Sequence, residues 1–259
     1  MPNKKVAKKK VAKKKVAKKV AAKKVAKKKA AKKKRARRSA ACPQTKRART
    51  VLKHARESVD SFFTTYDLAR QERGAGQSAP TNTEQDLTRA ALVFAAAGLD
   101  SAIKELIRGS LRKLAKSDED VQDGLQSFVK SRLRKDQDAG GDAKNKFLAR
   151  LLMSPESSDV LVDEYVLFLT GSSLQSASEL NKAAKALDIE VTELKQERKE
   201  TKDAFDIRNN IIHELDVRFG AGQGQRKRNN RRKNDLETKS NLLLDIGDSF
   251  IKAVEKKLE

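Results

Sequence analysis

The distribution of charge is the sequence feature that most constrains how this chain can fold. The first 56 residues hold 26 Lys or Arg, and the first acidic residue is Glu57. Like charges this dense cannot bury enough apolar surface to fold alone, so we expect residues 1–48 to form a disordered tail. The rest of the chain holds 33 of the 59 basic residues against all 35 acidic ones, a net charge of −2. The net charge of +24 therefore comes from the N-terminus, and we expect a nearly neutral domain over residues 49–259, with its core over about 84–258.

The tail repeats Lys-Lys-Val-Ala-Lys and its variants over residues 4–38, which hold 21 cations and no acid. Its composition is similar to the Lys/Ala-rich tails of linker histones and bacterial histone-like proteins. Each phosphate that such a tail neutralises releases a counterion, so we expect nucleic-acid binding that is salt-sensitive and blind to sequence. A membrane surface fits less well, because the apolar residues of the repeat are only Ala and Val. The tail residues that we expect to bind nucleic acid are Lys8, Lys13, Lys18, Lys23, Lys28, Lys33, Arg35, Arg37 and Arg38.

The Cys and His content limits the chemistry of the chain. Cys42 is the only cysteine, so an intrachain disulfide is excluded and a reducing compartment fits best. With two His far apart, a thiolate or imidazole metal cluster cannot form within one chain, and we expect no cofactor. A magnesium site built from carboxylates alone remains open. No run of 18 apolar residues occurs, so we expect a cytoplasmic protein without a membrane segment, associated with the nucleoid, or nuclear in a eukaryotic cell.

Apolar residues recur at helical spacing through the rest of the chain, which predicts an all-α domain. The helix over 84–115 is apolar on most sides, so it should be the central buried helix, and Thr81 or Thr83 should begin it. The helices between 144 and 169 look like an insertion that extends the bundle. The expected helices are 50–73, 84–115, 118–135, 144–153, 157–169, 177–187, 191–218 and 236–258.

The helix expected over 191–218 carries the candidate site, formed by Arg208, Asn209 and His213. Asn209 and His213 share a helix face, and Arg208 lies at about 140° and ~7.5 Å along the axis from His213. An Arg can hold a phosphate, an imidazole moves protons near neutral pH, and an amide can orient either group. The alternative is a surface Arg, a mid-helix Asn pair and a half-buried His. Three apolar residues should continue the stripe that packs this helix: Ile211, Ile212 and Leu215.

Asp100 lies in the largely apolar central helix. A carboxylate there is unfavourable unless it is paired or faces a site. Arg208 is one expected partner, and a solvent-facing pair with Lys104 is the alternative. Asp100 is therefore a candidate site residue.

A glycine-rich segment over 220–224 leads from the motif helix into a group of cations. Because these cations begin where that helix ends, they can follow a nucleic-acid backbone beside the site. A flexible surface loop is the alternative. The cations are Arg226, Lys227, Arg228, Arg231, Arg232 and Lys233.

The run Arg208–His213, Arg-Asn-Asn-Ile-Ile-His, resembles the Arg-x(4–6)-His motif of HEPN domains. In that family an earlier apolar helix carries an acidic residue, usually Glu, and Asp100 falls at the corresponding place. The likeness covers about residues 84–258 and implies a HEPN-like up-and-down helical bundle with inserted helices. The segments between about 117 and 190 and the basic loop at 223–234 do not contribute to the match.

HEPN proteins are commonly metal-independent ribonucleases of toxin–antitoxin, antiviral and RNA-processing systems, and some are inactive binding modules. The resemblance implies an RNA substrate, a homodimer whose two motifs meet in one cleft, and a cognate antitoxin or inhibitor in toxin members. It also implies cleavage by 2′-OH attack to a 2′,3′-cyclic phosphate, in which His213 moves protons and Arg208 stabilises the phosphate. Asn209 would then orient the substrate or His213, and Asp100 would position Arg208 or tune the imidazole.

Two other readings of the sequence stay open. In the first, the protein is a non-catalytic, histone-like or nucleoid-associated binder whose helical domain mediates dimerisation or partner binding. In the second, the domain is an antitoxin-like or adaptor module that keeps the motif without activity. Each chain offers one plausible catalytic His for two proton transfers, which favours a dimer if the protein is an enzyme.

Overall fold

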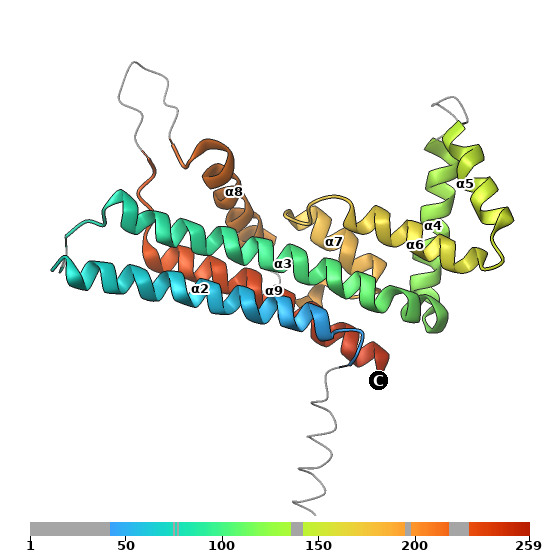
Figure 1. Cartoon of the computed structure of the whole chain (residues 1–259), viewed down its shortest axis with the longest axis horizontal. Coiled ribbons are helices and arrows are strands. Elements are labelled where there is room, and N and C mark those ends of the chain that lie inside the picture. The colour runs from blue at the N-terminus through green and yellow to red at the C-terminus, as the bar shows by residue number, and fades with distance from the viewer. Residues whose placement is uncertain (1–41, 75, 77, 136–141, 195–197, 218–227) are drawn as a thin grey trace, which may run out of the picture. The chain divides into compact units, whose positions relative to one another are not determined.

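The computed structural model describes residues 42–74, 76, 78–135, 142–194, 198–217 and 228–259 (Figure 1). Contacts divide the chain into the units Met1–Cys42 and Pro43–Glu259. Every tail cation named above lies outside the described residues, and so do Arg226 and Lys227. The described part of the second unit is helical, apart from an isolated antiparallel bridge between Val217 and Arg228. The predicted all-α class is therefore confirmed.

Most of the predicted helices are confirmed to within about one turn. The expected helix over 191–218 is wrong, because it is divided into a short 3-10 helix and a separate α-helix that ends at Glu214. The elements in order are α2 (Lys46–Glu72), α3 (Asn82–Ser117), α4 (Glu119–Lys135), α5 (Asp142–Met153), α6 (Ser157–Thr170), α7 (Ala177–Ala186), η1 (Val191–Leu194), α8 (Arg198–Glu214) and α9 (Lys233–Leu258).

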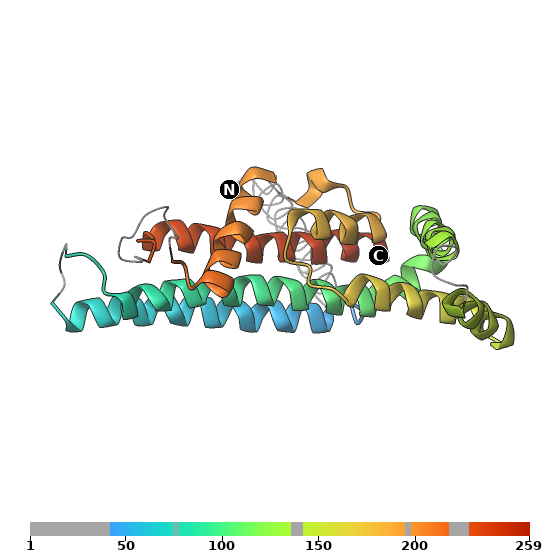
Figure 2. The same ribbon diagram turned by 90° about the horizontal axis from the view of Figure 1, so that it is seen from above.

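The core forms where α2 and α9 pack along α3, which is the predicted central buried helix (Figures 1 and 2). Gly98 of α3 makes this approach close, because a Cβ atom at this position would lie 2.2 Å from Cβ of Ala55 on α2. Gly247 has the same role on α9, where a Cβ atom would lie 2.9 Å from Cδ1 of Leu52. Small residues therefore bring the three long helices into contact. Each described helix is either too short or too polar to cross a membrane.

Thr81, which is one of the two residues predicted to begin α3, is its N-cap. The Glu84 backbone N–H donates to Oγ1 of Thr81 at 3.2 Å, and the Thr81 backbone N–H donates to Oε2 of Glu84 at 2.7 Å. This reciprocal pair is a capping box. Hydrogen bonds from Arg73, at the end of α2, lower the pKa of Glu84 to about 2. An ionised Glu84 thus joins the end of α2 to the start of α3.

The segment from α4 to α7 returns the chain from the far end of α3 to the motif helix. Figure 1 shows α4, α5 and α6 at the end of α3 that is opposite to the α2–α3 turn. Asp118 ends α3 and begins α4, where its Oδ1 accepts from the Val121 backbone N–H at 3.2 Å. Ser176 caps α7 through the Glu179 backbone N–H at 3.2 Å. Helix α7 then packs against both α4 and α8.

Candidate functional site

Helix α8 presents the motif because its opposite face is buried. Phe205 and Ile207 pack into the core, while Arg208 and Asn209 are half-buried and His213 is exposed in the last turn. The motif is therefore held on a packed helix and faces outward. Its His lies nearest to the helix end.

The predicted apolar stripe is wrong beyond Ile211. Ile211 is half-buried and packs against the core, but the Ile212 side chain is exposed and Leu215 is 67% exposed. The physical reason for Leu215 is the end of α8 at Glu214, since Leu215 and Asp216 have φ of 51° and 58° and turn the chain away. Residues in this left-handed region cannot continue a right-handed helix. Ile212 still belongs to α8 and lies on the exposed side of its last turn.

The guanidinium of Arg208 has an unsatisfied donor. Its Nη1 donates to Oδ1 of Asn209 at 3.0 Å, whereas its buried Nε has no hydrogen-bond partner among the described residues. Burial lowers the pKa of Arg208, and the charge of Asp100 opposes this shift. Most buried polar groups in proteins are hydrogen-bonded. Because Nε is buried, an anion such as a phosphate can approach only the solvent-exposed part of this half-buried guanidinium.

Asp100 forms its ion pair with Lys104 and not with Arg208. Its Oδ2 accepts from Nζ of Lys104 at 3.0 Å, and its Oδ1 accepts from the Leu174 backbone N–H at 2.7 Å. Arg208 therefore interacts with Asp100 through charge at longer range. The structure brings Asp100, Arg208 and Asn209 into one neighbourhood, and His213 lies more than one turn further along α8.

A buried ion-pair network fixes the chain directly after His213. Asp216 is 0% exposed, and its carboxylate accepts hydrogen bonds from three side chains. The donors are Nη2 of Arg231 at 2.8 Å, Nδ2 of Asn229 at 2.8 Å and Nε of Arg89 at 3.2 Å. Burial by itself raises the pKa of Asp216, but these hydrogen bonds and the charges of the two arginines outweigh it, so the pKa is lowered. The network ties the end of α8 to α3 and to the segment before α9.

Sequence reasoning missed this network. Arg89 lies in the central helix and its side chain is 2% exposed. Charged side chains are almost never buried without a partner, so an Arg within a predicted buried helix was the available signal. Its partner Asp216 had no distinguishing feature in the sequence.

Three of the described cations that follow the motif helix are ion-paired within the domain. These pairs are Arg228 with Asp86 at 2.6 Å, Arg231 with Asp216 at 2.8 Å and Lys233 with Asp67 at 2.7 Å. Arg232 is exposed at the start of α9. The pairs show a structural role for the three residues, and their contact with nucleic acid stays a prediction.

Three aspartates among the described residues form a cluster with the spacing of a cation site. Asp118, Asp120 and Asp188 place oxygen atoms within 4.8 Å of one another. However, Nζ of Lys257 donates to Oδ2 of Asp118 at 2.9 Å and also to Asp188. The ammonium of Lys257 therefore contacts two of the three carboxylates and offsets one of their negative charges.

The sequence model of the family described as RiboL-PSP-HEPN matches residues 63–256. The chain belongs to this HEPN family. The match confirms the resemblance drawn from Arg208–His213, and it also spans the helices between 117 and 190. Neither the curated proteins nor the solved structures contain a match to the chain. Membership of a HEPN family favours a nuclease or an RNA-related role for this RiboL-PSP-HEPN protein.

Proposed function

We propose that this RiboL-PSP-HEPN protein is a metal-independent endoribonuclease that cleaves RNA through attack by the ribose 2′-OH. The observation that carries the proposal is the half-buried Arg208, whose Nη1 is held by Asn209 at 3.0 Å on the packed helix α8. A guanidinium oriented in this way can bind a phosphate oxygen through the part that solvent reaches. His213, on the same helix, supplies an exposed imidazole.

In the proposed reaction, His213 takes the proton of the 2′-OH as the 2′-oxygen forms a bond to phosphorus. The bond between phosphorus and the 5′-oxygen breaks, and a second imidazole gives a proton to the leaving 5′-oxygen. The products are a 2′,3′-cyclic phosphate and a 5′-hydroxyl. Arg208 stabilises the charge that develops on the non-bridging oxygens, since a fixed cation stabilises the transition state more than the ground state.

The second imidazole is proposed to come from another copy of the chain. The only other His, His54, is exposed on α2 and pairs with Glu57 at 3.1 Å. Two copies of His213 would supply the base and the acid. Exposed Ile212 and Leu215 flank His213 and fit a surface that a second copy covers. We infer a homodimer with the motifs across a two-fold seam, acting as a toxin or antiviral effector controlled by a cognate inhibitor.

The test is cleavage of an end-labelled RNA in the presence of EDTA by the wild type, His213→Ala and the control His54→Ala. General acid–base catalysis contributes about 10²–10⁴-fold, so His213→Ala should lose at least a hundredfold in rate while His54→Ala keeps the wild-type rate. A substrate with a deoxyribose at the cleaved position should remain intact. Cleavage of that substrate, or undiminished cleavage by His213→Ala, would rule out the mechanism.

A second function is favoured by the 21 cations within residues 4–38. In this reading the protein is a non-catalytic nucleic-acid binder, and the helical domain serves for dimerisation or partner binding. The same incubation separates the two proposals, because a gel shift without any cleavage by the wild type supports the binder. The enzyme requires cleavage that depends on His213.

A further inference from the structure

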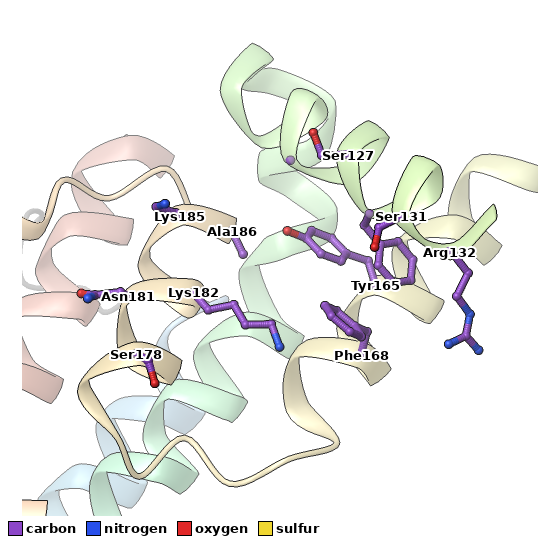
Figure 3. Close-up of a pocket in the computed structure, with 12 residues that line it drawn as sticks. Ser127, Ser131, Arg132, Tyr165, Phe168, Ser178, Asn181, Lys182, Lys185 and Ala186 are labelled. Atoms are coloured by element: carbon purple, nitrogen blue, oxygen red, sulfur yellow. The ribbon is translucent and has the colours of Figure 1, made fainter. Parts of the chain in front are cut away.

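Helices α4, α6 and α7 line an open cavity of about 700 Å³ on the inserted part of the domain (Figure 3). Pockets that hold small molecules are typically in the range of about 300–1,000 Å³. The cavity is lined by residues of these three helices and by none of the residues assigned to the HEPN motif. It is therefore separate from the proposed catalytic site.

One wall of the cavity is aromatic. The ring centroids of Phe128 and Phe168 lie 5.0 Å apart, and those of Tyr165 and Phe168 lie 6.5 Å apart with planes inclined by 14°. Phe168 is 43% exposed, so part of its ring is uncovered. An exposed aromatic face beside a cavity is a platform on which a nucleobase can stack.

The rest of the lining is polar and positively charged. It includes Arg132, Lys182 and Lys185 together with three serines, and none of its residues is an Asp or Glu. In Figure 3 the Lys182 side chain extends from α7 toward Phe168, and its Nζ lies 4.2 Å from the ring centroid. Its ion pair with Glu179 is long, at 3.7 Å. The lysine can swing from the ring face to a phosphate, because its four-carbon chain is flexible.

The Tyr165 hydroxyl adds a directional group. Figure 3 shows its oxygen pointing toward α7, while its ring lies in the same aromatic wall as Phe168. Burial raises the pKa of Tyr165, so the phenol stays protonated and can donate a hydrogen bond at neutral pH. A base on Phe168 would have this donor beside it.

We propose that the cavity between α4, α6 and α7 binds a nucleotide, with its base stacked on Phe168 and its phosphate held by Lys182. Aromatic platforms combined with cations are the arrangement by which proteins hold single-stranded nucleic acid. The nucleotide can be part of an RNA strand or a free mononucleotide. Helix α7 also packs against α8, which carries Arg208, so a strand bound at both places would pass over α7. This inference does not rest on ribonuclease activity.

The experiment measures binding of two probes to the full-length chain at high salt, which suppresses the contribution of the basic tail. The first probe is a 2′-O-methyl oligoribonucleotide, which cannot be cleaved through its 2′-oxygen. The second is a mixture of AMP and UMP. The variants are Phe168→Ala, Phe168→Trp, Lys182→Gln and the control Leu167→Ala, which changes the exposed residue next to Phe168 but outside the cavity lining.

Phe168→Ala should weaken binding about tenfold or more, and Phe168→Trp should restore it, because alanine removes the stacking surface and tryptophan enlarges it. Lys182→Gln should weaken binding and reduce its salt dependence, whereas Leu167→Ala should bind as the wild type does. Loss for the oligonucleotide alone identifies an RNA strand as the ligand, and loss for the mononucleotides as well identifies a free nucleotide. Equal binding of both probes by Phe168→Ala and the wild type would overturn the proposal. Phe168→Ala should keep the far-UV circular dichroism of the wild type but unfold at a lower temperature than Leu167→Ala, because Phe168 is less exposed and packs on Phe128 and Tyr165.

Discussion

Replacing Asp216 by Asn tests whether the buried network holds the end of the motif helix. The substitution removes the negative charge that Arg231 and Arg89 share, and Arg89, at 2% exposed, keeps only the partly exposed Asp86 as a carboxylate partner, at 3.0 Å. Removing one partner of a buried ion pair costs about 3–5 kcal/mol. Since the free energy of unfolding of a typical domain is only about 5–15 kcal/mol, this is a large fraction of the total. At about 2–4 °C per kcal/mol for a domain of this size, the Tm should fall by roughly 6–20 °C.

The assay is urea unfolding followed by far-UV circular dichroism, with Asp163→Asn as the matched control. Asp163 also lies close to an arginine, 2.6 Å from Arg112, but its side chain is 63% exposed. Exposed pairs contribute about 0–1 kcal/mol, so the control should shift the urea midpoint only slightly. Equal midpoint shifts for the two variants would refute the reasoning that burial gives the Asp216 network its weight.

The pH dependence gives a second check on the same residue. The pKa of Asp216 is lowered in the folded state, so its stabilisation is complete above the ordinary value of about 4 and is lost as the pH falls through the folded pKa. The stability difference between the wild type and Asp216→Asn should therefore shrink as the pH is lowered below about 4. A difference that grows in acid would contradict the assigned ionisation.

The remaining predictions concern packing, capping and the tail. Gly98→Ala should lower the free energy of unfolding by about 1–3 kcal/mol or more, because the added Cβ would overlap Ala55. Gly124→Ala should not destabilise α4, because the atom nearest to its added Cβ is the Tyr165 hydroxyl oxygen at 3.5 Å. The urea midpoints of the two variants measure the difference. Glu84→Gln should lower the Tm at neutral pH and have much less effect near pH 2, since the pKa of Glu84 is about 2 in the folded state and about 4.3 when unfolded. Thermal melts of both proteins between pH 2 and pH 7 measure the change. Deleting residues 1–42 should weaken RNA binding and flatten its salt dependence, while the cleavage rate at saturating RNA stays the same. If the tail engages ten phosphates, the log–log slope of binding against salt for the full chain should be about −7 to −9. A slope unchanged by the deletion would argue against tail binding.

The local signals in the sequence were sufficient for most of the helices and for the family, but not for the bounds of the helix that carries the motif. Thr81 with Glu84 predicted the start of α3, and the apolar pattern predicted the buried central helix, because both depend on neighbours within a few residues. The motif Arg208–His213 is short, but its place on a late helix of an all-α domain was enough to indicate the HEPN family, which the match over residues 63–256 confirms. The Lys104 alternative for Asp100 was likewise predictable, since the two lie four residues apart on one helix.

The sequence by itself determined the helical class, the order of the long helices and the position of the motif, because these follow from spacings along one segment. Only the tertiary structure decided where α8 ends and what surrounds its arginine. Arg89 and Asp216 are 127 residues apart in sequence, and neither position of the turn, Leu215 or Asp216, is a Gly or Pro that would mark it. The free Nε of Arg208 is equally a result of packing, since a donor loses its water only when separate helices close around it. Charge pairing and burial depend on distances in space. Spacing along the sequence fixes those distances only within a single helix.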